Sequence, residues 1–135
     1  MSYCITISGE KFPIFDWLTS DPYFKIIIDD KEYKSEVIND NLNPVWKPIE
    51  VYASTPWMLN FGKTTSFYTT DHDVPVTVEI WDSDCLNPDD FMGKVVLPLK
   101  DFLETGVHDL MDKRGNLLED ENGEQSRLSL QILSI

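Results

Sequence analysis

The chain has 135 residues, which suits one domain of ordinary size. Hydrophobic residues make up 41% of it and aromatic residues 12%, so a core can form and global disorder is excluded. The 24 acidic and 11 basic residues give a net charge of −13, which argues against a nucleic-acid partner and against simple electrostatic adhesion to anionic lipid.

Apolar and polar residues alternate in six short segments, the pattern of half-buried β-strands. In chain order the apolar positions are Tyr3, Ile5 and Ile7; Phe24, Ile26 and Ile28; Val45, Ile49 and Val51; Val74, Val76, Val78 and Ile80; Val95, Leu97 and Leu99; and Leu128, Leu130 and Ile132. With two further strands at 34–38 and 107–111, the sequence predicts an all-β fold, an eight-stranded antiparallel β-sandwich. One short helix is predicted over 99–105, with Gly106 as its stop.

Residues 53–73 are long for a connection within a sandwich, so this segment is either functional or contains structure of its own. The run at 65–70 is a candidate extra strand. We expect residues 1–135 to form a single domain, with 53–73 as an insertion that could serve as a surface for a protein partner.

Several absences in the sequence indicate a soluble intracellular domain. Cys4 and Cys85 are far apart and outside any CxxC pattern, so two free thiols are expected, as in a reducing compartment. The first residues lack a basic stretch followed by a long apolar run, so no signal peptide is expected. No apolar run approaches the length that spans a membrane.

Three segments between predicted strands are rich in aspartate: 15–22, 38–44 and 81–91. Alternate connections of a sandwich emerge at the same end, so the aspartates of these segments are expected to converge there. The residues concerned are Asp16, Asp21, Asp82, Asp84 and Asp90, with Asp40 and Asn87 near the rim.

A hard divalent cation is the ligand that such oxygen-rich loops favour. Ca²⁺ takes six to eight oxygen ligands, whereas Mg²⁺ prefers a stricter octahedron and zinc prefers His or Cys. The spacing is not that of an EF-hand, because no glycine follows and the third odd position is Leu86. The alternative is that each aspartate caps a turn, since aspartate commonly bonds nearby backbone N–H groups.

The segments SDPYFKI, NLNPVWKPIEV and VEIWDSD followed by DDFMGKVVLPL resemble the C2 domain in its calcium-binding form, over nearly the whole chain. The resemblance implies an eight-stranded sandwich that binds calcium, two or three ions, at one end. The first strand leads directly into the first acidic segment, which resembles the permuted (type II) topology of cytosolic phospholipases and novel protein kinases C. The 53–73 insertion would then lie at the end opposite the metal.

Carried over by residue, the resemblance implies a ligand set drawn from all three segments. The implied side-chain ligands are Asp16, Asp21, Asp82, Asp84 and Asp90, with Asn87 as an optional ligand and Asp40 as a ligand in some members. The backbone carbonyls of Phe15 and Ser83 complete the set. The segment between Asp16 and Asp21 is one residue shorter than in the family pattern, and Asp89 is expected to be solvated.

Apolar residues occupy the tips of two of these segments: Trp17, Leu18, Cys85 and Leu86. They either fold back onto the core or insert into a membrane once calcium has neutralised the surrounding carboxylates. The sequence therefore predicts a calcium-dependent phospholipid-binding module without catalytic activity, cytoplasmic and recruited to membranes by calcium. Two alternatives remain: a calcium-independent protein-interaction domain, and the regulatory domain of a larger lipid-signalling enzyme.

Overall fold

The computed structural model of the chain describes residues 2–15, 17–54, 58–62, 64–69 and 72–135. Its elements are β1 (Ser2–Glu10), β2 (Pro22–Ile28), β3 (Lys31–Lys34), β4 (Ile49–Ser54), β5 (Met58–Phe61), β6 (Thr65–Tyr68), β7 (Pro75–Asp82), β8 (Asp90–Pro98), α1 (Leu99–Phe102), β9 (Gly106–Asp109) and β10 (Arg127–Ser134). The all-β class is confirmed: the strands form two antiparallel sheets, in the orders β6-β5-β4-β1-β10-β9 and β3-β2-β7-β8.

The core is built by the alternating apolar residues of the four longest central strands, because each strand turns one face toward the opposite sheet. Ten of these residues are at most 1% exposed: Ile5, Ile7, Phe24, Ile26, Ile28, Val76, Val78, Ile80, Leu128 and Leu130. Trp46 and Phe12 extend the core toward one end of the sandwich, where the Trp46 ring meets Phe24 edge-on at 5.0 Å.

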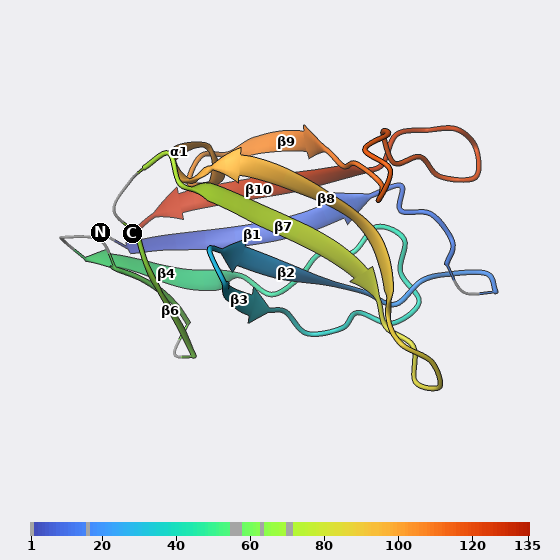
Figure 1. The fold of residues 1–135 in the computed structure, drawn as a ribbon, viewed down its shortest axis with the longest axis horizontal. Helices are drawn as coiled ribbons and strands as arrows, with labels where there is room; N and C mark the ends of the chain where they lie inside the picture. Colours follow the sequence, from blue (N-terminus) through green and yellow to red (C-terminus); the bar gives the residue numbers. More distant parts are fainter. Residues whose placement is uncertain (1, 16, 55–57, 63, 70–71) are drawn as a thin grey trace.

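The strand order places four connections at the same end of the sandwich, at the right in Figure 1. We call them the first loop (residues 11–21), the second loop (35–48), the third loop (83–89) and the fourth loop (110–126). The helix α1 and both chain termini lie at the other end, at the left of the figure. The three acidic segments therefore emerge together, beside a fourth connection.

The described residues contain ten strands rather than eight, because the 53–73 segment forms a hairpin of its own. In it β5 pairs with β4, and β6 pairs with β5, so the hairpin widens one sheet to six strands. Phe61 and Phe67 of the hairpin are buried and pack edge-on with ring centroids 5.0 Å apart. In Figure 1 β6 lies at the left, away from the first three loops.

Two strand predictions were displaced. A strand was predicted at 34–38, but the observed strand β3 lies at Lys31–Lys34. It ends at Lys34 because the Ser35 hydroxyl accepts the Phe24 N–H at 2.9 Å in place of a backbone carbonyl. Val45 does not share the inward face of Ile49: it is 64% exposed, and Trp46 is buried instead.

The strand predicted over 45–51 and the helix predicted over 99–105 both differ in their bounds from the structure. Lys47 and Pro48 are both exposed, which interrupts the alternation, and β4 begins only at Ile49. The helix α1 ends at Phe102, and Gly106 opens β9 rather than stopping the helix. Pro98 closes β8, which is an edge strand of its sheet, as expected for a proline within a strand pattern.

Candidate functional site

Asp21 joins the first, second and third loops through three hydrogen bonds. Its backbone N–H donates to Asp82 Oδ1 at 2.7 Å, and its carbonyl accepts the Ser83 N–H at 3.0 Å. Its carboxylate oxygen Oδ1 accepts the Asp40 N–H at 2.7 Å. This arrangement follows from strand pairing, since Pro22 at the start of β2 lies opposite Asp82 at the end of β7.

The two strands that carry the third loop bring Asp82 and Asp90 opposite each other. Residues directly opposed in an antiparallel pair project to the same face of the sheet. Asp82 is 2% exposed, whereas Asp90 is exposed. One buried and one exposed carboxylate therefore flank the base of the third loop.

Within the third loop, Asp84 and Asp89 organise the backbone. Asp84 Oδ1 accepts the N–H groups of Leu86 at 2.9 Å and Asn87 at 3.2 Å. Asp89 accepts the Asp84 N–H at 3.0 Å and the Tyr23 hydroxyl at 2.5 Å. Asp89 is half-exposed, and besides water it meets Tyr23 of the SDPY segment, which reaches it from β2, a contact that the sequence analysis did not predict.

These contacts favour the charged form of the two third-loop carboxylates. The pKa of Asp84 is lowered mainly by the backbone hydrogen bond from Leu86 and next by the one from Asn87. The pKa of Asp89 is lowered mainly by the hydrogen bond from the Tyr23 hydroxyl and next by the one from the Asp84 N–H. Burial, followed by the hydrogen bond to Asp89, raises the pKa of Tyr23 and keeps its hydroxyl a donor.

The donor set fits a calcium ion in its chemistry, since it consists of carboxylate, amide and carbonyl oxygens. Among the described residues, however, no group of three or more His, Cys, Asp or Glu side chains is arranged to hold a metal ion. Asp16 lies outside the described residues. Calcium binding by Asp21, Asp82, Asp84 and Asp90, and by Phe15, Ser83, Asp40 and Asn87 beside them, stays a prediction.

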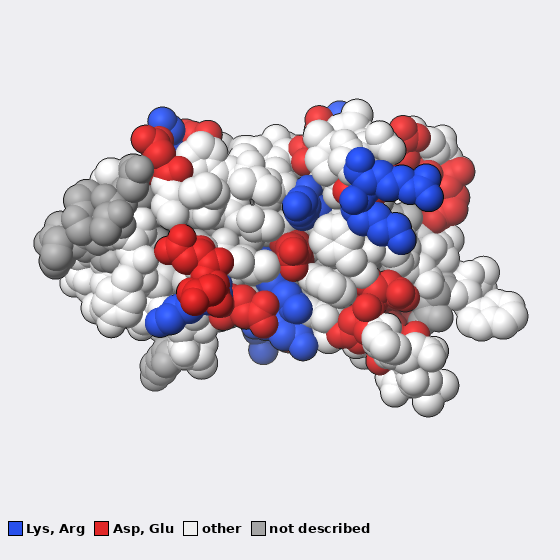
Figure 2. Space-filling model, in the orientation of Figure 1, with Lys and Arg blue, Asp and Glu red and all other residues white. Residues whose placement is uncertain are grey.

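Apolar side chains extend beyond the acidic loops. Trp17 is 97% exposed, Leu18 83% and Leu86 88%, so none of the three folds back onto the core. Cys85 beside Leu86 is an exposed free thiol. In Figure 2 white atoms project from the right end of the molecule next to red, acidic ones, at the place of the third loop in Figure 1.

Lysines on β2 and β3 lie against aromatic rings rather than forming a free basic cluster. The Nζ atoms of Lys25, Lys34 and Lys31 lie 4.6, 4.5 and 5.3 Å from the rings of Trp81, Tyr23 and Tyr68, respectively. Lys25 also lies 3.8 Å from the Glu32 carboxylate. In Figure 2 blue and red atoms adjoin below the centre of the molecule, so both signs of charge occur on this face.

No helix in the described part of the chain combines the length and apolar composition needed to cross a membrane.

A family model described as "C2 domain" matches residues 8–113. The chain is 26% identical over 126 residues to Protein C2-DOMAIN ABA-RELATED 3 of Arabidopsis thaliana, which covers 84% of this chain and 66% of that protein. It is 35% identical over 108 residues to Multiple C2 and transmembrane domain-containing protein 2 of Mus musculus, covering 78% of this chain and 10% of that protein. The chain thus spans only part of the length of these relatives.

Solved structures show the same fold. A C2 domain of plant Extended Synaptotagmin 1 superposes with a TM-score of 0.66 at 18% identity, covering 98% of this chain and 91% of that one. The calcium-bound pair of C2 domains from Extended-Synaptotagmin 2 gives a TM-score of 0.62 at 22% identity, covering 97% of this chain and 44% of that one. At these identities the structures show the fold alone, but together with the family model that matches most of its length they establish that the chain belongs to the C2 domain family.

Proposed function

We propose that this protein is a calcium-dependent phospholipid-binding module of the cytoplasm, without catalytic activity, which calcium recruits to membranes. One observation carries the proposal: Asp21 joins three acidic loops at one end of the sandwich, and almost fully exposed apolar side chains extend beyond them. Membership of the C2 family and the calcium-bound state named for Extended-Synaptotagmin 2 support it.

In this proposal two or three calcium ions are held by oxygens of the first and third loops. Asp21, Asp82, Asp84 and Asp90 would supply the carboxylates, with Asp16 from the first loop. The carbonyls of Phe15 and Ser83 would complete the set, with Asp40 and Asn87 at its rim. Asp82 and Asp84 already receive backbone N–H bonds that fix one oxygen each, so calcium would use their remaining lone pairs.

The calcium dependence follows from the sign of the charges around the tips. Two carboxylates about 4 Å apart repel each other by roughly 4 kcal/mol at an effective dielectric constant of 20. Without metal this ring of negative charge opposes contact with an anionic surface and is costly to desolvate. Two bound calcium ions would add four positive charges and remove that opposition.

The affinity for lipid would come from the exposed tips. Burial of a large apolar side chain contributes about 1.5–3 kcal/mol. Trp17, Leu18 and Leu86 together can therefore dock the domain reversibly, while Cys85 lies at the same tip. Because the lysines on β2 and β3 lie against aromatic and acidic side chains, we expect neutral headgroups to be tolerated.

Vesicle co-sedimentation with calcium or with a chelator tests the proposal. Wild-type protein should sediment with phosphatidylcholine vesicles in calcium and stay in solution with chelator. The variant D21N/D84N should stay in solution in both. The control D30N/E104Q changes the net charge equally at exposed positions and should behave as wild type. Equal sedimentation with and without calcium would refute calcium dependence, and no sedimentation with any lipid would refute the function itself.

A second candidate function, binding of a protein partner at the hairpin β5–β6, is favoured by a hollow at its base. A cavity of about 500 Å³ is lined there by Tyr3, Tyr52, Ala53, Ser54, Met58, Leu59, Thr69, His72, Leu99 and Leu103. Tyr52 and Tyr68 are also more than half exposed nearby. In affinity capture with chelator present, wild-type protein and D21N/D84N should then retain a partner protein that Y52S/Y68S does not retain. Identical capture by wild type and both variants refutes this function.

A further inference from the structure

The fourth loop contains two turns of the same geometry, eight residues apart. In each turn one aspartate oxygen accepts two backbone N–H groups at 2.8–3.0 Å: Asp112 from Arg114 and Asn116, and Asp120 from Asn122 and Glu124. Gly115 and Gly123 occupy the positions with positive φ, 83° and 75°. The turns 112–116 and 120–124 are therefore structural equivalents within one loop.

A ring of backbone hydrogen bonds holds the two turns together. Leu118 N–H donates to Leu110 O at 2.8 Å, Ser126 N–H to Leu118 O at 2.8 Å, and Leu110 N–H to Ser126 O at 3.2 Å. Leu110 and Ser126 are fully buried. The three residues are spaced by eight, so the loop is an ordered internal repeat rather than an irregular connection.

Of the two turns, 120–124 is the one whose side chains hold the first loop. Glu124 Oε2 forms an ion pair with Lys11 Nζ, and Glu121 Oε1 accepts the Ile14 N–H. The equivalent positions of the other turn carry Lys113 and Asn116, and within the described chain neither side chain bonds the first loop. The 112–116 turn can therefore serve as an internal control for the 120–124 turn.

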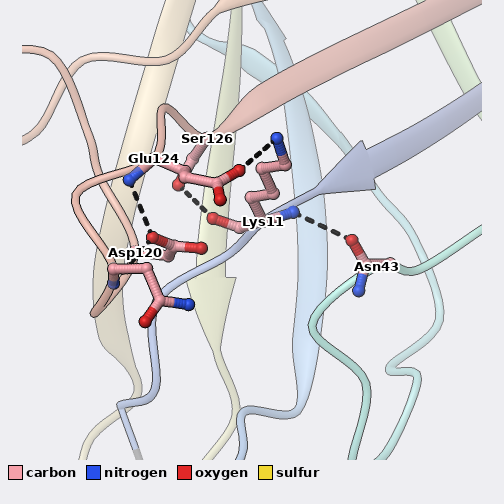
Figure 3. A network of polar contacts seen from close by, with 6 residues as sticks. Lys11, Asn43, Asp120, Glu124 and Ser126 are labelled. Carbon is pink, nitrogen blue, oxygen red and sulfur yellow. Dashed lines mark hydrogen bonds and ion pairs between the residues drawn. The ribbon is translucent and has the colours of Figure 1, made fainter.

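Lys11 is fixed on three sides (Figure 3). Its N–H donates to Asn43 Oδ1 at 2.9 Å, and its carbonyl accepts the Ser126 hydroxyl at 2.5 Å. Its φ of 56° lies in the left-handed region, which residues other than glycine adopt at a cost. The second and fourth loops therefore hold the first residue of the first loop in a defined, strained conformation.

The rest of the first loop is closed by a buried serine. The Ser20 hydroxyl donates to Pro13 O at 2.8 Å and accepts the Phe15 N–H at 2.9 Å. Ser20 is fully buried, so the base of the loop is a closed unit. Ile14 lies within this unit and Lys11 just before it, so Glu121 and Glu124 hold the unit from the fourth loop. The second loop holds it through Leu42 O, which accepts the Phe12 N–H at 3.0 Å, and through the Asn41 N–H, which donates to Ser20 O at 3.0 Å.

We propose that the 120–124 turn is a positioning element for the first loop, and that Glu121 and Glu124 set the direction in which Trp17 and Leu18 leave the surface. The membrane consequence rests on the proposed function, whereas the positioning itself does not. Lys11 and Glu124 have side chains 45% and 53% exposed, so their pair adds little to global stability and acts locally.

The mobility of a nitroxide label at position 17 tests the positioning without lipid or calcium. The label is placed by Trp17→Cys in a Cys4→Ser/Cys85→Ser background. The variant E121A/E124A should raise its mobility, as should Lys11→Met, which breaks the same pair from the other side. The matched variant K113A/N116A should leave it unchanged. Unchanged mobility in both E121A/E124A and Lys11→Met, or an equal rise in K113A/N116A, overturns the proposal.

The membrane consequence is measured on unlabelled protein with Trp17 in place. With calcium and phosphatidylcholine vesicles, E121A/E124A should bind about 2- to 10-fold more weakly, since binding must then order a looser loop. Neutral vesicles are used so that the two removed charges do not alter the attraction. If wild-type protein fails to bind vesicles, the proposed function falls while the label experiment still decides the positioning.

Discussion

Replacement of Trp17 by alanine should weaken calcium-dependent vesicle binding about 30-fold, by roughly 2 kcal/mol. The side chain is 97% exposed, so it contributes little to the fold and all its apolar surface is available to lipid. An aromatic side chain buries roughly 150–250 Å², which at about 25 cal/mol per Å² corresponds to roughly 4–6 kcal/mol for complete burial. Insertion to the headgroup boundary buries about half of it, and alanine retains a small part.

The measurement is a titration of protein with phosphatidylcholine vesicles at saturating calcium, paired with calcium titration in solution. Tyr68→Ala is the matched control, because Tyr68 is an aromatic residue 66% exposed on β6, away from the first loop. We expect Trp17→Ala to leave calcium affinity in solution unchanged. Unchanged vesicle binding, or an equal loss of calcium affinity, would show that Trp17 is not a lipid anchor and would refute the reasoning.

Three further predictions concern metal, acid and the hairpin. Calcium should raise the melting temperature of the wild-type protein and not that of D21N/D84N, because binding to the folded state alone stabilises it; calorimetry in which both gain equally would contradict the ligand assignment. The pKa values of Asp84 and Asp89 are lowered in the folded protein, so these carboxylates stabilise it above the ordinary carboxyl pKa, and this stabilisation is lost as the pH falls through the pKa of the folded state. Tyr23→Phe removes the hydrogen bond to Asp89 and should therefore make the loss of unfolding free energy in acid shallower. Denaturation curves with the same pH dependence in wild type and variant would contradict this. Phe61→Ala should cost about 3–5 kcal/mol in urea denaturation, as for core residues, and a cost below about 1 kcal/mol would mean that the hairpin folds apart from the core.

Alternation of apolar residues was enough to predict the sandwich, because long strands such as β2 and β7 bury one face along their whole length. It failed where a single residue interrupts the ladder. Pro48 separates Trp46 from Ile49, and the Ser35 hydroxyl replaces a backbone partner of Phe24. Neither event changes the apolar count, so periodicity alone could not locate the ends of β3 and β4.

For the candidate site, the sequence predicted which loops meet but not how they are bonded. The approach of Asp21, Asp40 and Asp82 follows from strand order, which the spacing of the acidic segments already indicated. The bond from Tyr23 to Asp89 depends on a side chain crossing between loops, and no local pattern indicates it.

The fourth loop was missed although it left a signal in the sequence. Asp112 and Asp120, each followed three residues later by a glycine, recur at an interval of eight. The sequence analysis does not identify this repeat, because two turns are too few to stand out from ordinary Asp- and Gly-containing turns.

The strands that bound the two sheets have a consequence for how the protein behaves at high concentration. Three of the four outermost strands, β3, β6 and β9, have only four residues each. The fourth, β8, is long, but Met111 exchanges two backbone hydrogen bonds with Lys94 at 2.8 and 2.9 Å and covers its middle. Because its edge strands are short or covered, few unpaired backbone N–H and C=O groups are available for pairing with a strand of another chain. This β-rich protein is therefore protected against edge-to-edge aggregation.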